Sequence, residues 1–146
     1  MYTFKKIIEI QTKYKGLFEI TNQIQQVVKE SKITSGLCNL FILHTSASLI
    51  IQENADPSVI HDMEYFFEKL VPENDLGYHH TTEGPDDMPS HIRCALTKTS
   101  EQIPLDKGEL FLGTWQGVFL WEHRNKGSLR KIVIHILGEK FRNKLV

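Results

Sequence analysis

The sequence contains no long hydrophobic run, almost no net charge and only two cysteines. Its longest apolar stretches, such as residues 40–43 and 48–51, are far shorter than the roughly 20 residues that a helix needs to span a bilayer. The first ten residues carry Glu9 among apolar positions and no small-residue cleavage site, a pattern typical of a strand and not of a signal peptide. We therefore expect a soluble, cytoplasmic protein with no membrane partner.

The charges balance, with 17 basic residues against 18 acidic ones. A balanced chain has no overall field that attracts nucleic acid, so we expect no nucleic-acid partner and a function that depends on local charges. Cys38 and Cys94 lie among apolar neighbours and form no CxxC spacing. This setting favours buried free thiols over a disulfide or a metal pair.

A length of 146 residues without repeats, linkers or low-complexity segments predicts one compact domain over residues 1–146. Segments of alternating or continuous apolar character, many rich in β-branched and aromatic residues, indicate strands. The expected strands span residues 2–10, 37–43, 48–52, 109–114, 117–123 and 130–139. Together with two to three helices they predict an α+β fold with a mainly antiparallel sheet core.

The expected helices begin at recognisable capping residues. Thr21 or Asn22 can cap a helix whose apolar residues share one stripe, and Asp56 followed by Pro57 is a strong helix start. In that second helix His61 falls on the side opposite the apolar face and is expected in solvent. Residues 72–90 read as a long loop, a feature that is usually functional or disordered in a compact domain, and a third helix is expected near Pro89.

Seven histidines offer candidate ligands and acid–base groups. We interpret His135 as structural or solvated, whereas both a structural and a functional role stay open for His123. His44 closes an apolar strand and is followed by hydroxyl residues. His44, His80 and His91 would supply the three ligands of an open zinc site if the long loop folds over that strand end, and neutral imidazole suits this metal.

Acidic residues accompany these histidines. Asp86 and Asp87 precede the expected helix near Pro89, where one can cap the helix while the other orients a histidine, binds Mg²⁺ or acts as a base. Of a second pair, Asp56 is the expected cap and Glu53 the functional acid.

The motif LGTWQG, residues 112–117, predicts a two-residue hairpin connection through Trp115 and Gln116. Trp115 is either packed in the core or forms an aromatic wall beside an amide donor at a pocket rim. Arg124 and Arg130 could bind phosphate through two hydrogen bonds each.

Five motifs occur in a fixed order over nearly the whole chain: HTSASL, ENADP, EGPDDMPSH, LGTWQG and EHR at residues 122–124. In this order they resemble the YjbQ family, over residues from about 40 to 138. The resemblance implies a compact, sheet-rich α+β fold, a homotrimer, and the activity now often described for members, secondary thiamine-phosphate synthase. It points to a polar centre of three histidines with surrounding residues: His44, His80, His91, Glu53, Asp56, Asp87, Trp115, Gln116 and Glu122. Members frequently carry a basic residue before the second histidine, whereas this chain has His79, so either His79 or His80 can face the site.

The first functional hypothesis is therefore an enzyme, a transferase that joins hydroxymethylpyrimidine diphosphate to thiazole phosphate and releases pyrophosphate. A divalent metal, zinc or Mg²⁺, or histidine and arginine donors would stabilise the leaving group. The expected catalytic residues are His44, Glu53, Asp87 and His91, and the metal ligands are His44, His80 and His91. The substrate would contact Asp56, Asp86, Trp115, Gln116, Glu122 and Arg124. The alternatives are a zinc-dependent hydrolase of a small phosphorylated substrate and a trimeric metabolite-binding protein without catalysis.

Overall fold

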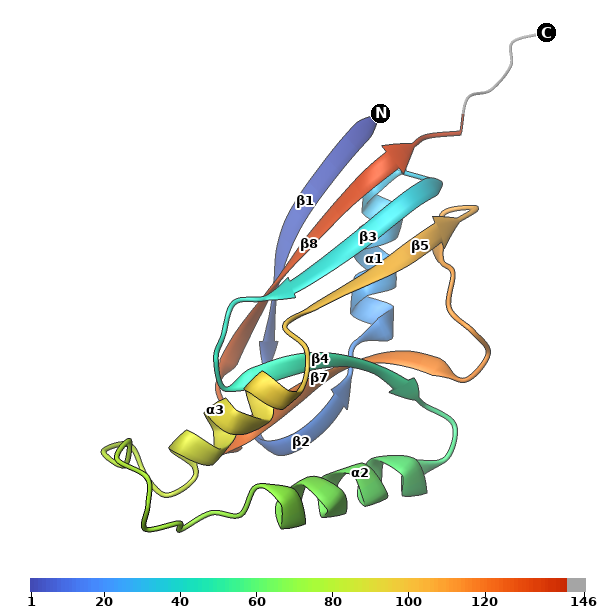
Figure 1. Ribbon diagram of the computed structural model, residues 1–146. Coiled ribbons are helices and arrows are strands. Elements are labelled where there is room, and N and C mark those ends of the chain that lie inside the picture. The colour runs from blue at the N-terminus through green and yellow to red at the C-terminus, as the bar shows by residue number, and fades with distance from the viewer. Residues whose placement is uncertain (142–146) are drawn as a thin grey trace, which may run out of the picture.

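The structure is a computed structural model that describes residues 1–141 of the chain (Figure 1). Within this range the chain forms eight strands and three helices. The strands are β1 (Tyr2–Gln11), β2 (Tyr14–Glu19), β3 (Ser35–Ile42), β4 (Ala47–Glu53), β5 (Ser100–Asp106), β6 (Glu109–Leu110), β7 (Gln116–Lys126) and β8 (Leu129–Glu139). The helices are α1 (Thr21–Ser31), α2 (Pro57–Leu70) and α3 (Asp87–Leu96). In the described range, no helix has the length and apolar composition that crossing a membrane requires.

The strands form two antiparallel sheets. The five-stranded sheet has the order β1-β8-β3-β5-β6, and the three-stranded sheet has the order β2-β7-β4. The predicted α+β class with a mainly antiparallel core is therefore confirmed. Strands β2 and β5 were not expected, because their short alternating segments contain Gly16 and Pro104, residues that are uncommon inside strands.

Three short connections, of at most four residues each, lead from one sheet into the other, from β1 to β2, from β3 to β4 and from β7 to β8 (Figure 1). The first and last of these crossings lie side by side, because Thr12 donates its N–H to the Ser128 carbonyl at 3.0 Å. A Cβ atom on Gly127 would stand 2.0 Å from the Thr12 carbonyl oxygen, so only glycine fits there. We call this bend, residues 12–13, 43–46 and 127–128, the corner.

The predicted hairpin through Trp115 and Gln116 is wrong. β6 ends at Leu110 and pairs with β5, whereas β7 begins at Gln116 and lies in the other sheet. The residues between them cross from sheet to sheet, and Leu112 packs against the core on the way. The apolar pattern that suggested a strand over residues 109–114 thus anchors a crossover.

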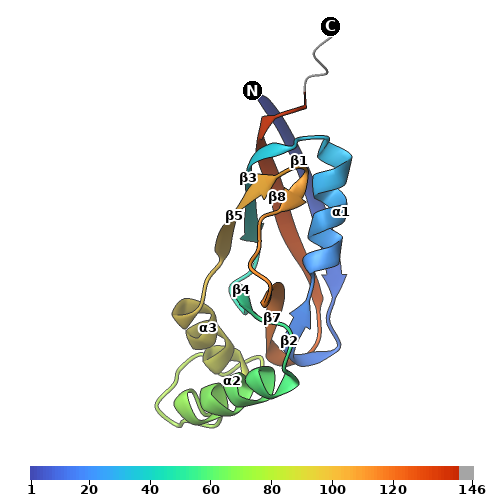
Figure 2. The same ribbon diagram turned by 90° about the vertical axis from the view of Figure 1, so that its right-hand side faces the viewer.

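The main core lies between α1 and the sheets (Figure 2). Ile24, Val27 and Val28 recur at helical spacing and are fully buried, which gives α1 one apolar face. The expected cap at Thr21 or Asn22 is not formed. The cap position is Ile20, and the Thr21 hydroxyl instead accepts from the Val118 N–H at 2.9 Å, which ties the helix start to β7.

Helix α2 begins as predicted, with the Asp56 side chain accepting from the Ser58 N–H at 2.9 Å. His61 is exposed on this helix, also as predicted. None of its residues is fully buried, so α2 is the least integrated helix of the described chain. The following loop is shorter than expected, since α3 already begins at Asp87, two residues before Pro89. Proline is compatible with this first turn, because its missing N–H has no intrahelical acceptor there.

Charged side chains fill the corner. Glu122 is fully buried, and its carboxylate accepts from Arg130 through both of its oxygens and from the Thr12 hydroxyl at 2.6 Å. Arg130 is also buried and donates to the Ser46 carbonyl at 3.2 Å. Glu122 is thus a structural partner of Arg130 and presents no carboxylate oxygen to a substrate.

His123 follows on β7 and is buried as well. Its Nε2 lies 2.8 Å from the Ser48 hydroxyl, and its Nδ1 has no hydrogen-bond partner among the described residues. Burial, with the positive charges of Arg93, Arg130 and Lys15, lowers the pKa of His123 from 6.5 to about 3. Of the two roles left open by the sequence, the structure thus favours the structural one.

This buried histidine predicts acid sensitivity. Between pH 6.5 and about 3 the unfolded chain binds a proton at His123 that the folded chain does not. The free energy of unfolding therefore falls with decreasing pH in this window, by up to about 1.4 kcal/mol per pH unit. In His123→Gln, which keeps a hydrogen-bonding group toward Ser48, urea unfolding from about pH 7 to pH 4 should show a shallower loss. The exposed His61→Gln should keep the wild-type slope, and a wild-type slope in His123→Gln would contradict the assignment.

Candidate metal centre

The acidic residues at the start of α3 are held by an arginine from β7. Arg124 donates through Nε to Asp86 at 3.0 Å, through NH1 to Asp87 at 2.7 Å and through NH2 to the Glu83 carbonyl at 2.9 Å. The Asn125 N–H also donates to Asp86 at 2.9 Å. Burial alone would raise the pKa of Asp86, but the hydrogen bonds from Asn125 and Arg124 outweigh it and hold this pKa below its ordinary value.

Neither carboxylate caps α3, although capping was one expected role for the pair. The N-cap residue Asp86 makes no side-chain cap hydrogen bond, because its Oδ2 already receives Arg124 and Asn125. The same contacts argue against the predicted role of Arg124 in binding phosphate, since each of its three nitrogens already has a protein acceptor.

Two histidines meet the carboxylate of Asp87. His80 Nε2 lies 2.7 Å from Asp87 Oδ2, and His91 Nε2 lies 3.3 Å from Asp87 Oδ1. The Asp87 side chain is only 3% exposed, whereas His80 is 57% exposed. One donor atom from each of the three residues falls within a sphere of metal-binding size, with all three atoms less than 4.8 Å apart. His80, and not His79, is therefore the histidine of the loop that faces Asp87.

A contact with the corner determines which ring nitrogen of His91 carries a hydrogen. His91 Nδ1 lies 2.9 Å from the Thr45 carbonyl oxygen, and because a carbonyl only accepts, Nδ1 must carry a hydrogen. In the neutral ring Nε2 is then unprotonated, and its lone pair points toward Asp87. This is the arrangement by which metal-binding histidines are usually oriented, with the distal N–H held by a backbone carbonyl.

Asp87 Oδ2 is buried, and its close contact is His80 Nε2 at 2.7 Å, a nitrogen that donates only when it carries a hydrogen. A buried carboxylate oxygen without a donor is costly and calls for a cation or a water. The three donor atoms, two imidazole nitrogens and a carboxylate oxygen, form a set that divalent transition metals accept.

His44 does not belong to this group, although the sequence predicted it as a ligand. Its Nε2 accepts from the Lys131 N–H at 2.8 Å, and Arg130 NH1 lies 3.3 Å from its Nδ1. Burial, Arg130 and Lys131 lower the pKa of His44 in spite of Glu122. Both ring nitrogens thus contact β8, and the carboxylate of Asp87 takes the place expected for this third imidazole.

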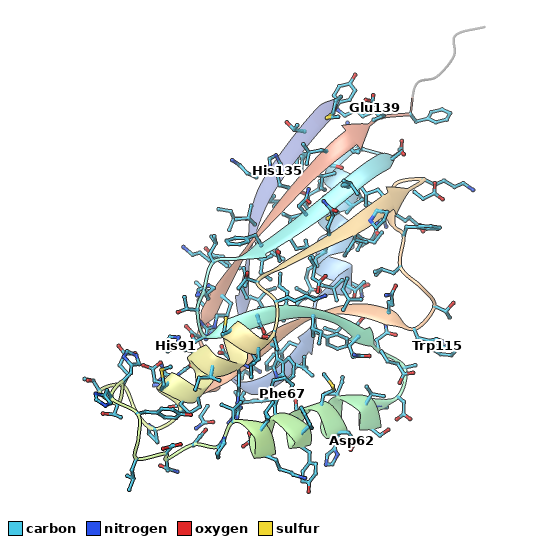
Figure 3. All side chains as sticks on the ribbon, viewed as in Figure 1. Asp62, Phe67, His91, Trp115, His135 and Glu139 are labelled. Carbon is cyan, nitrogen blue, oxygen red and sulfur yellow. The ribbon has the colours of Figure 1, made fainter. Side chains whose placement is uncertain are left out.

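The remaining predicted site residues lie at the opposite end of the three-stranded sheet. β4 pairs with β7 from Ala47 opposite Glu122 to Glu53 opposite Gln116, six residue steps or roughly 20 Å apart. Figure 3 shows Trp115 and His91 at the two ends. Trp115 is 63% exposed and Asp56 caps α2, so neither contributes to the metal centre. The role of the Thr45 carbonyl in orienting His91 could not be predicted from the sequence, since every residue carries a backbone carbonyl.

The chain was compared with known proteins. Residues 6–139 match the family model described as UPF0047 protein YjbQ-like. A UPF0047 protein of Synechocystis is 56% identical over 135 residues, which cover 92% of both chains. The UPF0047 protein YjbQ of Escherichia coli O157:H7 is 43% identical over 137 residues, 93% of this chain and 99% of the relative.

Solved structures agree with this assignment. A conserved hypothetical protein of Thermus thermophilus superposes with a TM-score of 0.81 at 30% identity, covering 90% of this chain and 99% of that one. A protein of unknown function from Sulfolobus solfataricus gives a TM-score of 0.82 at 25% identity, covering 94% and 100%. The folds are therefore the same over nearly the whole length.

These findings correct the functional prediction. The relatives are named only as UPF0047 proteins, and the Sulfolobus protein is described as one of unknown function, so nothing among them supports thiamine-phosphate synthesis or zinc-dependent hydrolysis. The structure explains the error, because the aromatic wall expected at Trp115 and the histidines lie at opposite ends of a sheet. The predicted synthase activity is wrong. The motifs that suggested it have a different meaning, for they and the fold show that this chain belongs to the YjbQ-like UPF0047 family.

Proposed function

We propose that the protein binds a divalent transition-metal ion through His80, Asp87 and His91 and presents it to a small anionic metabolite. The observation that carries the proposal is the convergence of His80 Nε2 and His91 Nε2 on the carboxylate of Asp87, which is 3% exposed, with one donor atom of each residue within 4.8 Å of the others. The His91 ring is held by the Thr45 carbonyl with its Nε2 toward the carboxylate. A metal ion would satisfy all three groups at once.

The charge of the surroundings supports a cation. Glu83, Asp86 and Asp87 bring three carboxylates against the single guanidinium of Arg124, which leaves an excess of negative charge beside the histidines. Arg124 also donates to Asp87 Oδ1 at 2.7 Å, so that the carboxylate keeps its direction toward the histidines.

Three protein ligands leave at least one position open on a four-coordinate ion. The open position would face solvent, because His80 is exposed. A small phosphorylated metabolite would bind there through its oxygen atoms, and the metal, not Arg124, would supply the positive charge. Zinc suits this nitrogen-rich set better than Mg²⁺, which prefers oxygen ligands and retains several waters.

Metal content tests the site directly. Untagged protein purified without chelator or added metal should carry about one transition-metal ion per chain, measured by mass spectrometry of the digested protein. His91→Ala and His80→Ala should each weaken zinc binding by about tenfold or more. His79→Ala is the matched control, since it removes the neighbouring histidine of the same loop, and it should bind like wild type.

The metabolite is tested on the same samples with inorganic phosphate as the probe. Phosphate should raise the unfolding temperature of the metal-loaded protein and leave the chelated protein and His91→Ala unchanged. Equal metal content in all variants would overturn the metal centre. A phosphate response that persists after chelation would overturn the role of the metal in binding.

A second part of the proposal is self-association into the homotrimer that the sequence motifs imply. Helix α1 covers one face of the five-stranded sheet, whereas no described helix covers most of the opposite face (Figure 2). Ile7 and Phe41 stand on this outer face on either side of Val133, and each is about half exposed. Exposed apolar patches of this kind commonly mark contacts between chains.

We also retain a cytoplasmic location as a prediction, in keeping with the free thiols of Cys38 and Cys94.

The substitution Phe41→Glu places a charge on this outer face and should convert the trimer to monomer, because an unpaired charge is costly in a buried interface. Light scattering after size-exclusion chromatography measures the mass. Phe66→Glu, at a similarly exposed phenylalanine of α2, is the control and should stay trimeric. A wild-type protein with the mass of one chain would refute this part of the proposal.

A further inference from the structure

Helix α2 rests on the three-stranded sheet through very few side chains. Phe67 meets Trp121 of β7 edge to face, with ring centroids 4.6 Å apart, and lies between the helix and the sheet (Figure 3). On one side of this contact is a cavity of about 260 Å³ and on the other a cavity of about 190 Å³, both bounded by Phe67 and Trp121. Both spaces are open to solvent, and together they leave the Phe67–Trp121 contact as a narrow support between the helix and the sheet.

The larger cavity combines aromatic walls with buried charge. Tyr65, Phe67 and Trp121 supply rings, while Lys15 and Arg93 supply cations. Arg93 is 3% exposed, and its Nε has no hydrogen-bond partner within the described residues. An arginine this deeply buried is expected to use its donors, since leaving one unsatisfied costs free energy.

The other nitrogens of Arg93 are only partly used. NH2 donates to the Val71 carbonyl at 2.9 Å, but NH1 approaches the Glu68 carboxylate no closer than 3.5 Å. Glu68 is half exposed and also pairs with Lys15 at 2.9 Å. Glu64 also lines the cavity, but among the described residues only Glu68 has a carboxylate within 4.0 Å of Arg93. Glu68 is a surface side chain at a loose distance, which a ligand carboxylate can replace.

We propose that this cavity is a second ligand site, independent of the metal centre, and that it takes a small aromatic carboxylate. The ring would lie against Trp121 and Phe67, and the carboxylate would accept from Arg93 in place of Glu68. A volume of about 260 Å³ is below the roughly 300–1,000 Å³ that holds a drug-sized ligand, so the occupant has a single ring.

Trp121 reports on its own cavity. The chain has two tryptophans, so Trp115→Phe removes the exposed one and leaves the Trp121 emission alone. Benzoate, added in the presence of a metal chelator, should change this emission in a saturable way at millimolar concentration. Benzyl alcohol, which has the same ring without the charge, should bind at least about tenfold more weakly, as expected for loss of a charge-assisted contact.

Variants on α2 and α3 identify the contacts. Arg93→Met replaces the guanidinium by an apolar side chain of similar length and should weaken benzoate binding by about tenfold or more. Glu68→Gln removes the competing carboxylate and should strengthen binding about threefold. Phe67→Ala should abolish it, whereas Phe66→Ala, on the solvent side of the same helix, should not alter it.

The α2 variants keep the test decisive if Arg93→Met does not fold. No saturable response to benzoate, equal binding of benzyl alcohol, or a Phe66→Ala effect as large as that of Phe67→Ala would overturn the proposal. Because every titration contains chelator, failure of the metal centre does not affect the result. Conversely, a response seen only in a parallel titration without chelator would assign the carboxylate to the metal and not to this cavity.

Discussion

The buried ion pair between Glu122 and Arg130 is the interaction on which the corner depends. Where the strands pass from one sheet to the other, these two side chains add to the backbone hydrogen bonds by binding Thr12, Ser46 and each other. Either residue alone would be an uncompensated charge away from water, which is far more costly than the pair. Backbone hydrogen bonds hold the two ends of residues 43–46, from the Leu43 N–H to the Lys131 carbonyl and from the His123 N–H to the Ser46 carbonyl, and the Arg130 contacts to Ser46 add to them.

The candidate metal centre is built on both sides of this pair. Thr45 lies in the segment that Arg130 holds, and its carbonyl sets the tautomer of His91. Arg124 lies two residues after Glu122, and its backbone N–H also donates to the Glu122 carboxylate at 3.1 Å. Its guanidinium then fixes Asp87. One ligand is thus oriented from each side, which is the kind of support that keeps a site in position before an ion arrives.

Local pattern predicted the parts of the fold that depend on local chemistry. The first strand, the buried stripe of α1 and the Asp56 cap of α2 each require only neighbouring residues, and all three agree with the structure. The partners of a strand depend on distant residues. The segment before Trp115 therefore looked like half of a hairpin, although its neighbour in space is β5.

The same distinction applies to the site. The sequence placed the histidines and acids in one centre, and the structure brings His80, Asp87 and His91 together. It could not show that Glu53 and Trp115 lie a whole strand away, because proximity along the chain does not reveal which end of a strand a residue occupies. Nor could it rank His44 below Asp87, since both neighbours of the His44 ring come from β8, more than eighty positions later.

Helix α3 contributes to both the metal centre and the cavity under α2, yet it keeps them apart. His91 and Arg93 are two positions apart, about 200° around a helix, so they point to opposite sides. One side faces the corner and the other faces α2. A ligand at Arg93 would therefore act on the metal centre only by moving the helix, and α3 is tied to β4 by the Cys94 and Thr97 contacts with Ala47 and Ser48. A helix fixed in this way separates the two sites, and each can be altered while the other keeps its geometry.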